Sequence, residues 1–183
     1  MRDLPVFLDK VVQIISEDLH YGNVSILTQD TNHHFIVVRA STGDPEDSMV
    51  GTRVPIDSSI TGGVFRSGEV ANVSNVQAHA DYLRMRSVTT MSEMAVPLII
   101  ESRVIGVINV EAPTMNAFTA LEERILTSVA AQIAPALELA TMHDEYKRAA
   151  QRDGLTGVYN HAAFYAHLEA MLLAERQFAL FMF

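Results

Sequence analysis

The residues best suited to contacting a ligand lie between Ser74 and Met91, the least regular stretch of the sequence. Tyr82, Met85 and Arg86 follow one another closely there. An aromatic ring, a thioether and a guanidinium can together stack on and charge-pair with a planar anionic molecule. The same side chains would equally serve to seal a hydrophobic lid, with the arginines in solvent. This stretch therefore predicts either a ligand-contacting cover or a plain lid.

A second candidate is SSITGGVFRSG, residues 58–68, which predicts a short helix capped by Asp57 or Ser58 and ended by Gly68. Its paired glycines are not a phosphate-binding loop, because the Gly-Lys-Ser/Thr ending is missing. The free backbone amides of a helix start still attract an anionic group. Ordinary capping and packing explains the same pattern. The candidate pocket residues here are Ser59, Ile60 and Thr61.

Catalysis and metal binding are not expected from the remaining reactive residues. The chain contains no cysteine, so disulfides, thiolate catalysis, zinc-thiolate sites and thioether-linked chromophores are excluded. His79 has no second ligand at helical or turn spacing, and a solvated histidine is the simpler interpretation. No nucleophile, base and orienting group share a recognisable spacing. The sequence names no cofactor and predicts no metal site.

Composition limits the partners. The 183 residues suit one domain plus a fragment, and 49% apolar content is enough for a packed core. A net charge of −9 disfavours a large phosphate-tracking surface and hence nucleic acid. The run AVPLII is far too short to span a membrane, and Asp3, Asp9 and Lys10 lie where a signal peptide would be apolar. We therefore expect a cytoplasmic protein without a membrane partner.

Residues 92–112, SEMAVPLIIESRVIGVINVEA, read as two apolar strands joined by a polar turn at residues 101–103. Both faces of such a hairpin must be covered, so we expect it at the centre of a sheet. Three residues break the apolar pattern: Pro97 cannot donate to a ladder, Gly106 permits close approach, and Asn109 places an amide among aliphatic side chains. Irregularities of this kind are typical of a pocket.

Further elements surround this hairpin. Residues 3–20 have the spacing of an amphipathic helix, and residues 23–29 and 34–41 read as strands. A long helix begins at Thr119, which forms a capping box with Glu122. It carries apolar residues in a 3-then-4 rhythm that is typical of a coiled coil with a second copy, although packing on its own sheet is the alternative. These residues are Leu126, Val129, Ile133, Ala136 and Ala140.

The segments VPLI, VIGVINVE and FTALEERILTSVAAQIAPALELA, in that order, resemble the C-terminal half of a GAF domain. The resemblance implies an α+β fold over residues 1–140: an antiparallel sheet of five to six strands, with N- and C-terminal helices on one face and a pocket under loops and short helices on the other. It also implies a homodimer through helices 3–20 and 119–150. Carried over by position, the pocket residues are Ile60, Thr61, Tyr82, Met85, Arg86, Met94, Val96 and Asn109.

The tail carries a second resemblance. DGLTGVYN, from Asp153 to Asn160, is similar to the opening of a GGDEF (diguanylate cyclase) domain, although His161 and Ala162 depart from the arginines usual after that asparagine. This implies a linker helix at 141–152 and an incomplete GGDEF start at 153–183. The metal-binding aspartates and the signature loop of that family are not reached, so we do not expect this chain to make cyclic di-GMP.

The resemblances favour a regulatory domain that senses a small molecule and controls a diguanylate cyclase through a dimeric linker helix. A ligand-free dimerisation or scaffolding module is the alternative. Cyclic-nucleotide binding is a weaker one: Asn116, Phe118, Glu122 and Glu123 partly resemble the motif of nucleotide-binding GAF domains, but Ala117 replaces its lysine and Glu122 its aspartate.

Overall fold

The computed structural model describes residues 4–30, 33–42, 48–84 and 90–173, apart from the Arg148 side chain. The chain separates into two compact units, Met1–Ala140 and Thr141–Phe183. Each unit is described by itself below.

The first unit is built on a six-stranded antiparallel sheet in the order β3-β2-β1-β6-β5-β4. The two longest strands, β5 and β6, are the predicted hairpin, and β1 and β2 lie where the alternation of the sequence predicts them. The short β3 was not predicted. The strands are β1 Asn23–Gln29, β2 Phe35–Ser41, β3 Arg53–Pro55, β4 Ala71–Val73, β5 Ser92–Ile100 and β6 Arg103–Ala112.

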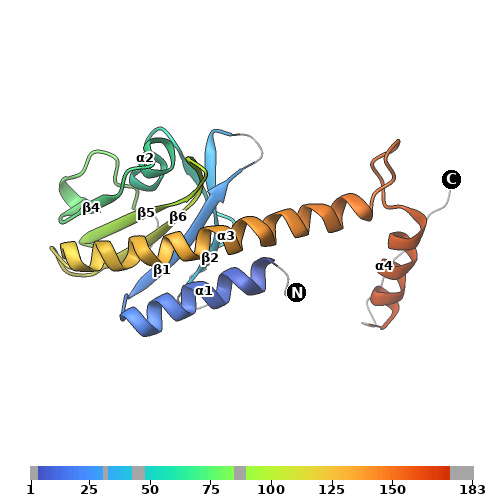
Figure 1. The fold of residues 1–183 in the computed structure, drawn as a ribbon, viewed down its shortest axis with the longest axis horizontal. Helices are drawn as coiled ribbons and strands as arrows, with labels where there is room; N and C mark the ends of the chain where they lie inside the picture. The colour runs from blue at the N-terminus through green and yellow to red at the C-terminus, as the bar shows by residue number, and fades with distance from the viewer. Residues whose placement is uncertain (1–3, 31–32, 43–47, 85–89, 174–183) are drawn as a thin grey trace. The chain divides into compact units, whose positions relative to one another are not determined.

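Helices cover the two faces of this sheet unequally (Figure 1). On one face, α1 (Leu4–Leu19) and the first part of α3 (Ala120–Ala150) bury their apolar sides in the main core. On the other face lie α2 (Ile60–Ser67) and the 3₁₀ turn Val76–Ala78, with a smaller apolar cluster beneath them. The expected α+β architecture is confirmed.

The β5–β6 hairpin turns through Glu101 and Ser102, whose φ angles of 47° and 72° are those of a type I′ turn. Leu98 pairs with Gly106 but Ile99 pairs with Val104, so one extra residue of β6 forms a bulge. The bulge shifts the pairing of every residue beyond it by one position.

The start of α3 is the predicted capping box. The backbone N–H of Thr119 donates to Glu122 Oε2 at 2.6 Å, and the N–H of Glu122 donates to Thr119 Oγ1 at 3.4 Å. The helix ends at Ala150, two residues before the expected end of the linker helix at residue 152.

In its first part, the apolar rhythm of α3 follows the alternative interpretation, which is packing on the sheet of the same domain. Leu126 is fully buried, and Val129 and Ile133 pack against the main core, because these positions face the sheet of the same domain. By length and composition Ala120–Lys147 would suffice to cross a membrane, with a mean hydropathy of 1.4. Within this helix Leu126 and Leu137 are buried in the domain core, and 22% of its apolar window is buried.

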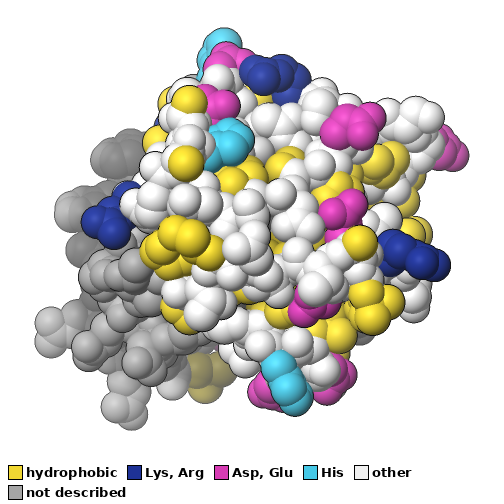
Figure 2. Space-filling model, turned by 90° about the vertical axis from the view of Figure 1, so that its left-hand side faces the viewer, with side chains coloured by type: hydrophobic (Ala, Val, Ile, Leu, Met, Phe, Trp, Pro, Cys, Tyr) yellow, Lys and Arg dark blue, Asp and Glu magenta, His cyan; other side chains and the backbone are white. Residues whose placement is uncertain are grey.

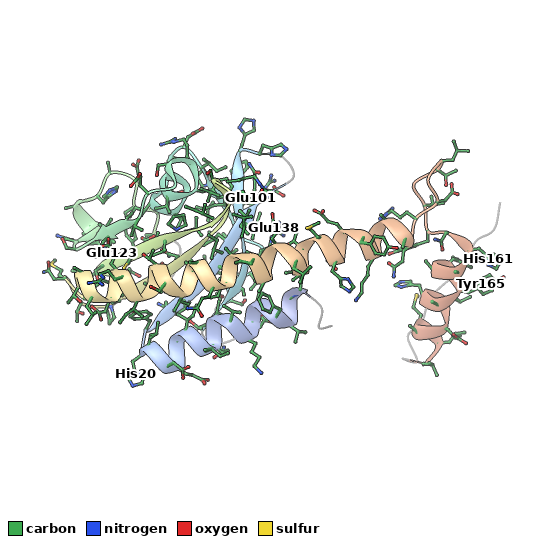
Figure 3. All side chains as sticks on the ribbon, in the orientation of Figure 1. His20, Glu101, Glu123, Glu138, His161 and Tyr165 are labelled. Carbon is green, nitrogen blue, oxygen red and sulfur yellow. The ribbon has the colours of Figure 1, made fainter. Side chains whose placement is uncertain are left out.

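The second unit contains a hydrogen-bonded turn followed by α4 (His161–Leu173). Asp153 Oδ1 accepts hydrogen bonds from the backbone N–H groups of Leu155 and Thr156 and from the Thr156 hydroxyl. Asn160 caps α4 by accepting from the N–H of Ala163 at 3.0 Å. Within the described part of this unit, α4 has no buried residue; His161 and Tyr165 contact each other on its surface (Figure 3).

Candidate ligand-binding site

A cavity of about 60 Å³ lies on the face of the sheet opposite α1 and α3. Strands β1, β2, β5 and β6 form its floor, and the first turn of α2 with the loop around Tyr82 forms its wall. The apolar part of the lining consists of Val24, Leu27, Val38, Met49, Val54, Ile60 and Leu83. The polar part consists of Asn23, Ser25, Ser59, Thr61, Tyr82, Thr90, Glu93, Asn109 and Glu111.

The register of the sheet brings the polar floor together. Glu93 of β5 is directly opposite Glu111 of β6, and Asn109 of β6 lies between Ala95 of β5 and Ser25 of β1. Directly paired residues present their side chains on the same face. The two carboxylates and the Asn109 amide therefore point into one cavity.

Burial strongly shifts the pKa of the Glu93 carboxyl in this floor. Glu93 is 6% exposed, and the pKa of its carboxyl is raised to about 8 by burial and, secondarily, by the charge of Glu111, although a hydrogen bond from Asn109 opposes the rise. Glu111 Oε2 accepts from the Thr90 hydroxyl at 3.0 Å. Asn109 is also 6% exposed, and its Oδ1 has no hydrogen-bond partner. A buried acceptor without a partner is costly, and in a cavity it marks a place for a donor.

The wall is fixed by the cap of α2. Ser59 is the N-cap and accepts from the N–H of Gly62 at 2.9 Å, one residue later than the predicted cap, while Gly68 ends the helix in the left-handed conformation as predicted. A Cβ on Gly62 would lie 2.5 Å from the carbonyl oxygen of Ile56, so this glycine allows α2 to approach the preceding segment. Ile60 and Thr61 are thereby held at the cavity.

The Tyr82 phenol is hydrogen-bonded to the Thr90 side chain, and burial raises its pKa. Tyr82, Thr90 and Glu111 therefore form a polar chain along one edge of the cavity. The His79 side chain makes a local hydrogen bond, in which its Nδ1 accepts from the backbone N–H of Asp81 at 3.2 Å. Among the described residues, no group of three or more His, Asp or Glu side chains is placed to hold a metal ion.

Four of the predicted pocket residues, Ile60, Thr61, Tyr82 and Asn109, line this cavity. Met85 and Arg86 lie outside the described residues, so their positions stay a prediction.

The assignment of Met94 and Val96 to the pocket was wrong. Met94 pairs with Val110 and Val96 with Ile108, and all four side chains are fully buried in the core beneath α1 and α3. They lie on the opposite face of the sheet from Asn109 because side chains alternate along a strand.

Sequence reasoning missed Glu93, Glu111 and Thr90. The available signal was the alternation itself: Glu93, Glu111 and Asn109 are polar interruptions of apolar strands. The alternation could not be converted into a shared face without knowing the bulge, because an unbulged two-residue hairpin would pair Asn109 with Met94 rather than with Ala95.

Known proteins share this architecture. The GAF domain of an Acinetobacter phosphoenolpyruvate-protein phosphotransferase superposes with a TM-score of 0.68 at 23% identity, covering 78% of this chain and 86% of that one. The free methionine-R-sulfoxide reductase of Neisseria meningitidis, solved with its substrate, gives a TM-score of 0.68 at 23% identity, covering 77% and 81%. At these identities the likeness concerns the fold alone.

In sequence, protein YtsP of Bacillus subtilis is 25% identical over 85 residues, which is 46% of this chain. The match spans about half of that relative, 52% of its length. The model of the GAF domain family matches residues 1–138. Because that match covers most of the chain, the protein belongs to the GAF domain family.

Proposed function

We propose that residues 4–140 form a sensor domain that binds a small molecule in the cavity described above and regulates an output domain. The observation that carries this proposal is the buried, partnerless Oδ1 of Asn109 beside the buried carboxyl of Glu93. Polar groups without partners destabilise a purely structural core, whereas they are typical of a site that a ligand completes. GAF domains are sensor modules of signalling proteins, and the solved neighbours include a domain of a methyl-accepting chemotaxis protein.

The role we propose is binding without catalysis. Several structural neighbours are free methionine-R-sulfoxide reductases, and one of them was solved with its substrate. This chain has no cysteine with which to perform thiolate chemistry. The comparison supports the binding of a compact ligand in this fold. We do not extend the methionine sulfoxide reduction of those enzymes to this chain.

Strands β5 and β6 provide a route from the cavity to α3. Their one face carries Glu93 and Asn109 at the cavity, and their other face carries Met94 and Val110, which pack in the same core as Leu126 of α3. At the hairpin turn, Arg103 forms an ion pair with Glu138 of α3 at 2.7 Å. A ligand that moves this hairpin would therefore move α3.

We further propose that α3 acts in a homodimer with α1. The side of α3 away from the core carries Leu121, Ile125, Leu139 and Met142, which are 64%, 36%, 60% and 61% exposed. Ser128, Gln132 and Pro135 complete a 3-then-4 spacing between them, which is that of a two-stranded coiled coil. On α1, Val6 and Ile14 are also exposed and apolar.

The proposed output is a diguanylate cyclase, through the linker helix at 141–152. Its support is the resemblance of residues 153–160 to the opening of a GGDEF domain. We propose that the protein works in the cytoplasm without a nucleic acid or membrane partner. The net charge of −9 supports this, and in the end view of Figure 2 the basic side chains do not gather into a patch.

Native mass spectrometry of the purified chain tests the sensor proposal. We expect a bound species that is released on denaturation and is lost in Asn109→Leu, while Thr127→Glu, an exposed change on α3, retains it. If neither a bound species nor a thermal shift with a metabolite library is found, the ligand-free scaffolding module is the better description.

A further inference from the structure

The polar end of the cavity is rich in hydrogen-bond acceptors. Glu93 and Glu111 contribute carboxylates, and Asn109 contributes an Oδ1 that has no partner. The Asn109 amide N–H and the Thr90 hydroxyl are already engaged with these two carboxylates. A ligand group placed here therefore meets acceptors and must supply donors.

The charge of this end is negative. Glu93 and Glu111 are a directly opposed pair on neighbouring strands, an arrangement in which like charges repel. The lining contributed by the described residues includes no lysine, arginine or histidine. Burial and Glu111 raise the pKa of Glu93 to about 8, so a proton on Glu93 relieves the repulsion when no cation is bound. A cation with N–H groups would relieve it equally well.

The rest of the lining defines what the cation is attached to. Leu27, Val38, Met49 and Val54 form an apolar region of the lining next to the acidic end. A metal ion would leave this apolar region unused, and the described residues offer no cluster of three ligands for one. An anionic or purely apolar molecule would leave the acceptors unsatisfied.

We propose that the cavity recognises a small primary ammonium compound with a short apolar chain, whose –NH₃⁺ group lies between Glu93, Glu111 and Asn109 Oδ1. Three N–H donors of an ammonium match these three acceptors. The inference rests on the proposed sensor function and specifies its ligand class. Both an α-amino acid and a simple alkylamine satisfy it, since they share this ammonium group.

Thermal shift and calorimetry on the 183-residue chain test the proposal with matched probes. L-Leucine and L-methionine represent amino acids, isoamylamine represents amines, and N-acetyl-leucine and isocaproate lack the ammonium. We expect the two amino acids or isoamylamine to raise the melting temperature of the chain. N-acetyl-leucine and isocaproate should leave the melting temperature unchanged. If L-leucine or L-methionine binds and isoamylamine does not, the source is an amino acid; the reverse identifies an amine.

Variants locate the ammonium. Glu93→Gln should weaken binding of the active probe at least tenfold at pH 8, whereas Glu101→Gln in the exposed hairpin turn should leave it unchanged. Circular dichroism of both variants shows that the fold is kept. Equal affinity of wild type and Glu93→Gln for the amine would overturn the proposal.

Proton release gives a second, independent readout. The groups that face Glu93 are Glu111 and Asn109 from β6 and Tyr82 and Thr90 from the loops; no titratable side chain of α2 lines the cavity. A cation there favours the ionised carboxyl, so binding at pH 7 should release up to about one proton. Calorimetry in two buffers of different ionisation enthalpy measures it, and the absence of release contradicts the assigned contact.

The experiments distinguish failure of the ammonium proposal from failure of the sensor proposal. If isocaproate, a divalent cation or an unrelated co-purified molecule occupies the cavity and is lost in Asn109→Leu, the sensor stands and the ammonium class is wrong. If no probe or co-purified species binds, both fail together.

Discussion

Glu93 and Glu111 are directly opposite each other on β5 and β6, and both side chains face the same cavity. Like charges so placed repel, and burial disfavours the ionised form of Glu93 in addition. The pair thus destabilises the domain unless a ligand compensates the two charges, and it links stability to pH.

The first prediction concerns this linkage. The pKa of Glu93 is raised in the folded state, to about 8 from an ordinary value of 4.5, so the native state binds its proton more tightly than the unfolded state. The stability contributed by protonation is fully present below pH 4.5 and is lost as pH rises through 8, by at most roughly 1.4 kcal/mol per pH unit.

Glu93→Gln removes that titration. Urea denaturation from pH 5 to pH 8.5 should show the free energy of unfolding of the variant rising steadily above that of the wild type, with Glu101→Gln as control. A difference that does not change with pH would show that Glu93 has an ordinary pKa.

The second prediction separates stability from binding at Asn109. Asn109→Leu removes a buried amide oxygen that has no partner, which is favourable, but also the hydrogen bond from the amide N–H to Glu93, which is unfavourable, so the free energy of unfolding should change by less than about 1 kcal/mol, while the ligand-induced thermal shift is lost. Asn72→Leu should behave in the opposite way: it loses hydrogen bonds to Phe118 O and Glu123 Oε2, so it should cost about 1 kcal/mol and keep the shift. Parallel denaturation and ligand titration of both variants checks this contrast.

The third prediction compares two neighbouring glycines of α2. A Cβ on Gly62 would lie within 2.6 Å of the carbonyl oxygens of Pro55 and Ile56, so Gly62→Ala should destabilise the domain by roughly 1–3 kcal/mol and displace the cavity wall. A Cβ on Gly63 has nothing within 4 Å, so Gly63→Ala should stabilise it by about 0.8 kcal/mol through helix propensity. Chemical denaturation of the pair measures both signs; two destabilised variants would mean that α2 tolerates no added volume on either side.

The fourth prediction tests the proposed dimer. Leu139 is 60% exposed on the side of α3 proposed to form the dimer, so Leu139→Glu should convert a dimer into a monomer with little change in the melting temperature of the monomeric domain. Thr127→Glu, on an exposed position of α3 away from that side, should leave the dimer intact. Analytical ultracentrifugation decides it: a wild-type chain that is monomeric at high concentration rules the dimer out.

Several elements could be predicted from the sequence because their signals are local. The alternation of residues 92–112, the capping box of Thr119 with Glu122, and the C-cap at Gly68 each depend on neighbours within a few positions, and all are present in the structure. The order of motifs was enough to indicate the GAF fold, which the comparisons confirm.

The candidate site was only partly predictable. Ile60, Thr61, Tyr82 and Asn109 line the cavity, but Met94 and Val96 face the other way. The acidic pair was missed, because a glutamate in a strand is usually interpreted as a solvated residue unless its cross-strand partner is known.

The sequence alone determined the longer strands and helices, since apolar periodicity, caps and turn residues act over short distances, whereas the short β3 was not predicted. Only the tertiary structure decided which strand residues share a face. The bulge at Ile105 of β6, opposite the step from Leu98 to Ile99, shifts the register by one residue, and in a sheet with period two that single shift sets Glu93 opposite Glu111 and Asn109 beside them. The packing of both faces of the hairpin sets a bulge of this kind, so no local sequence pattern predicts it.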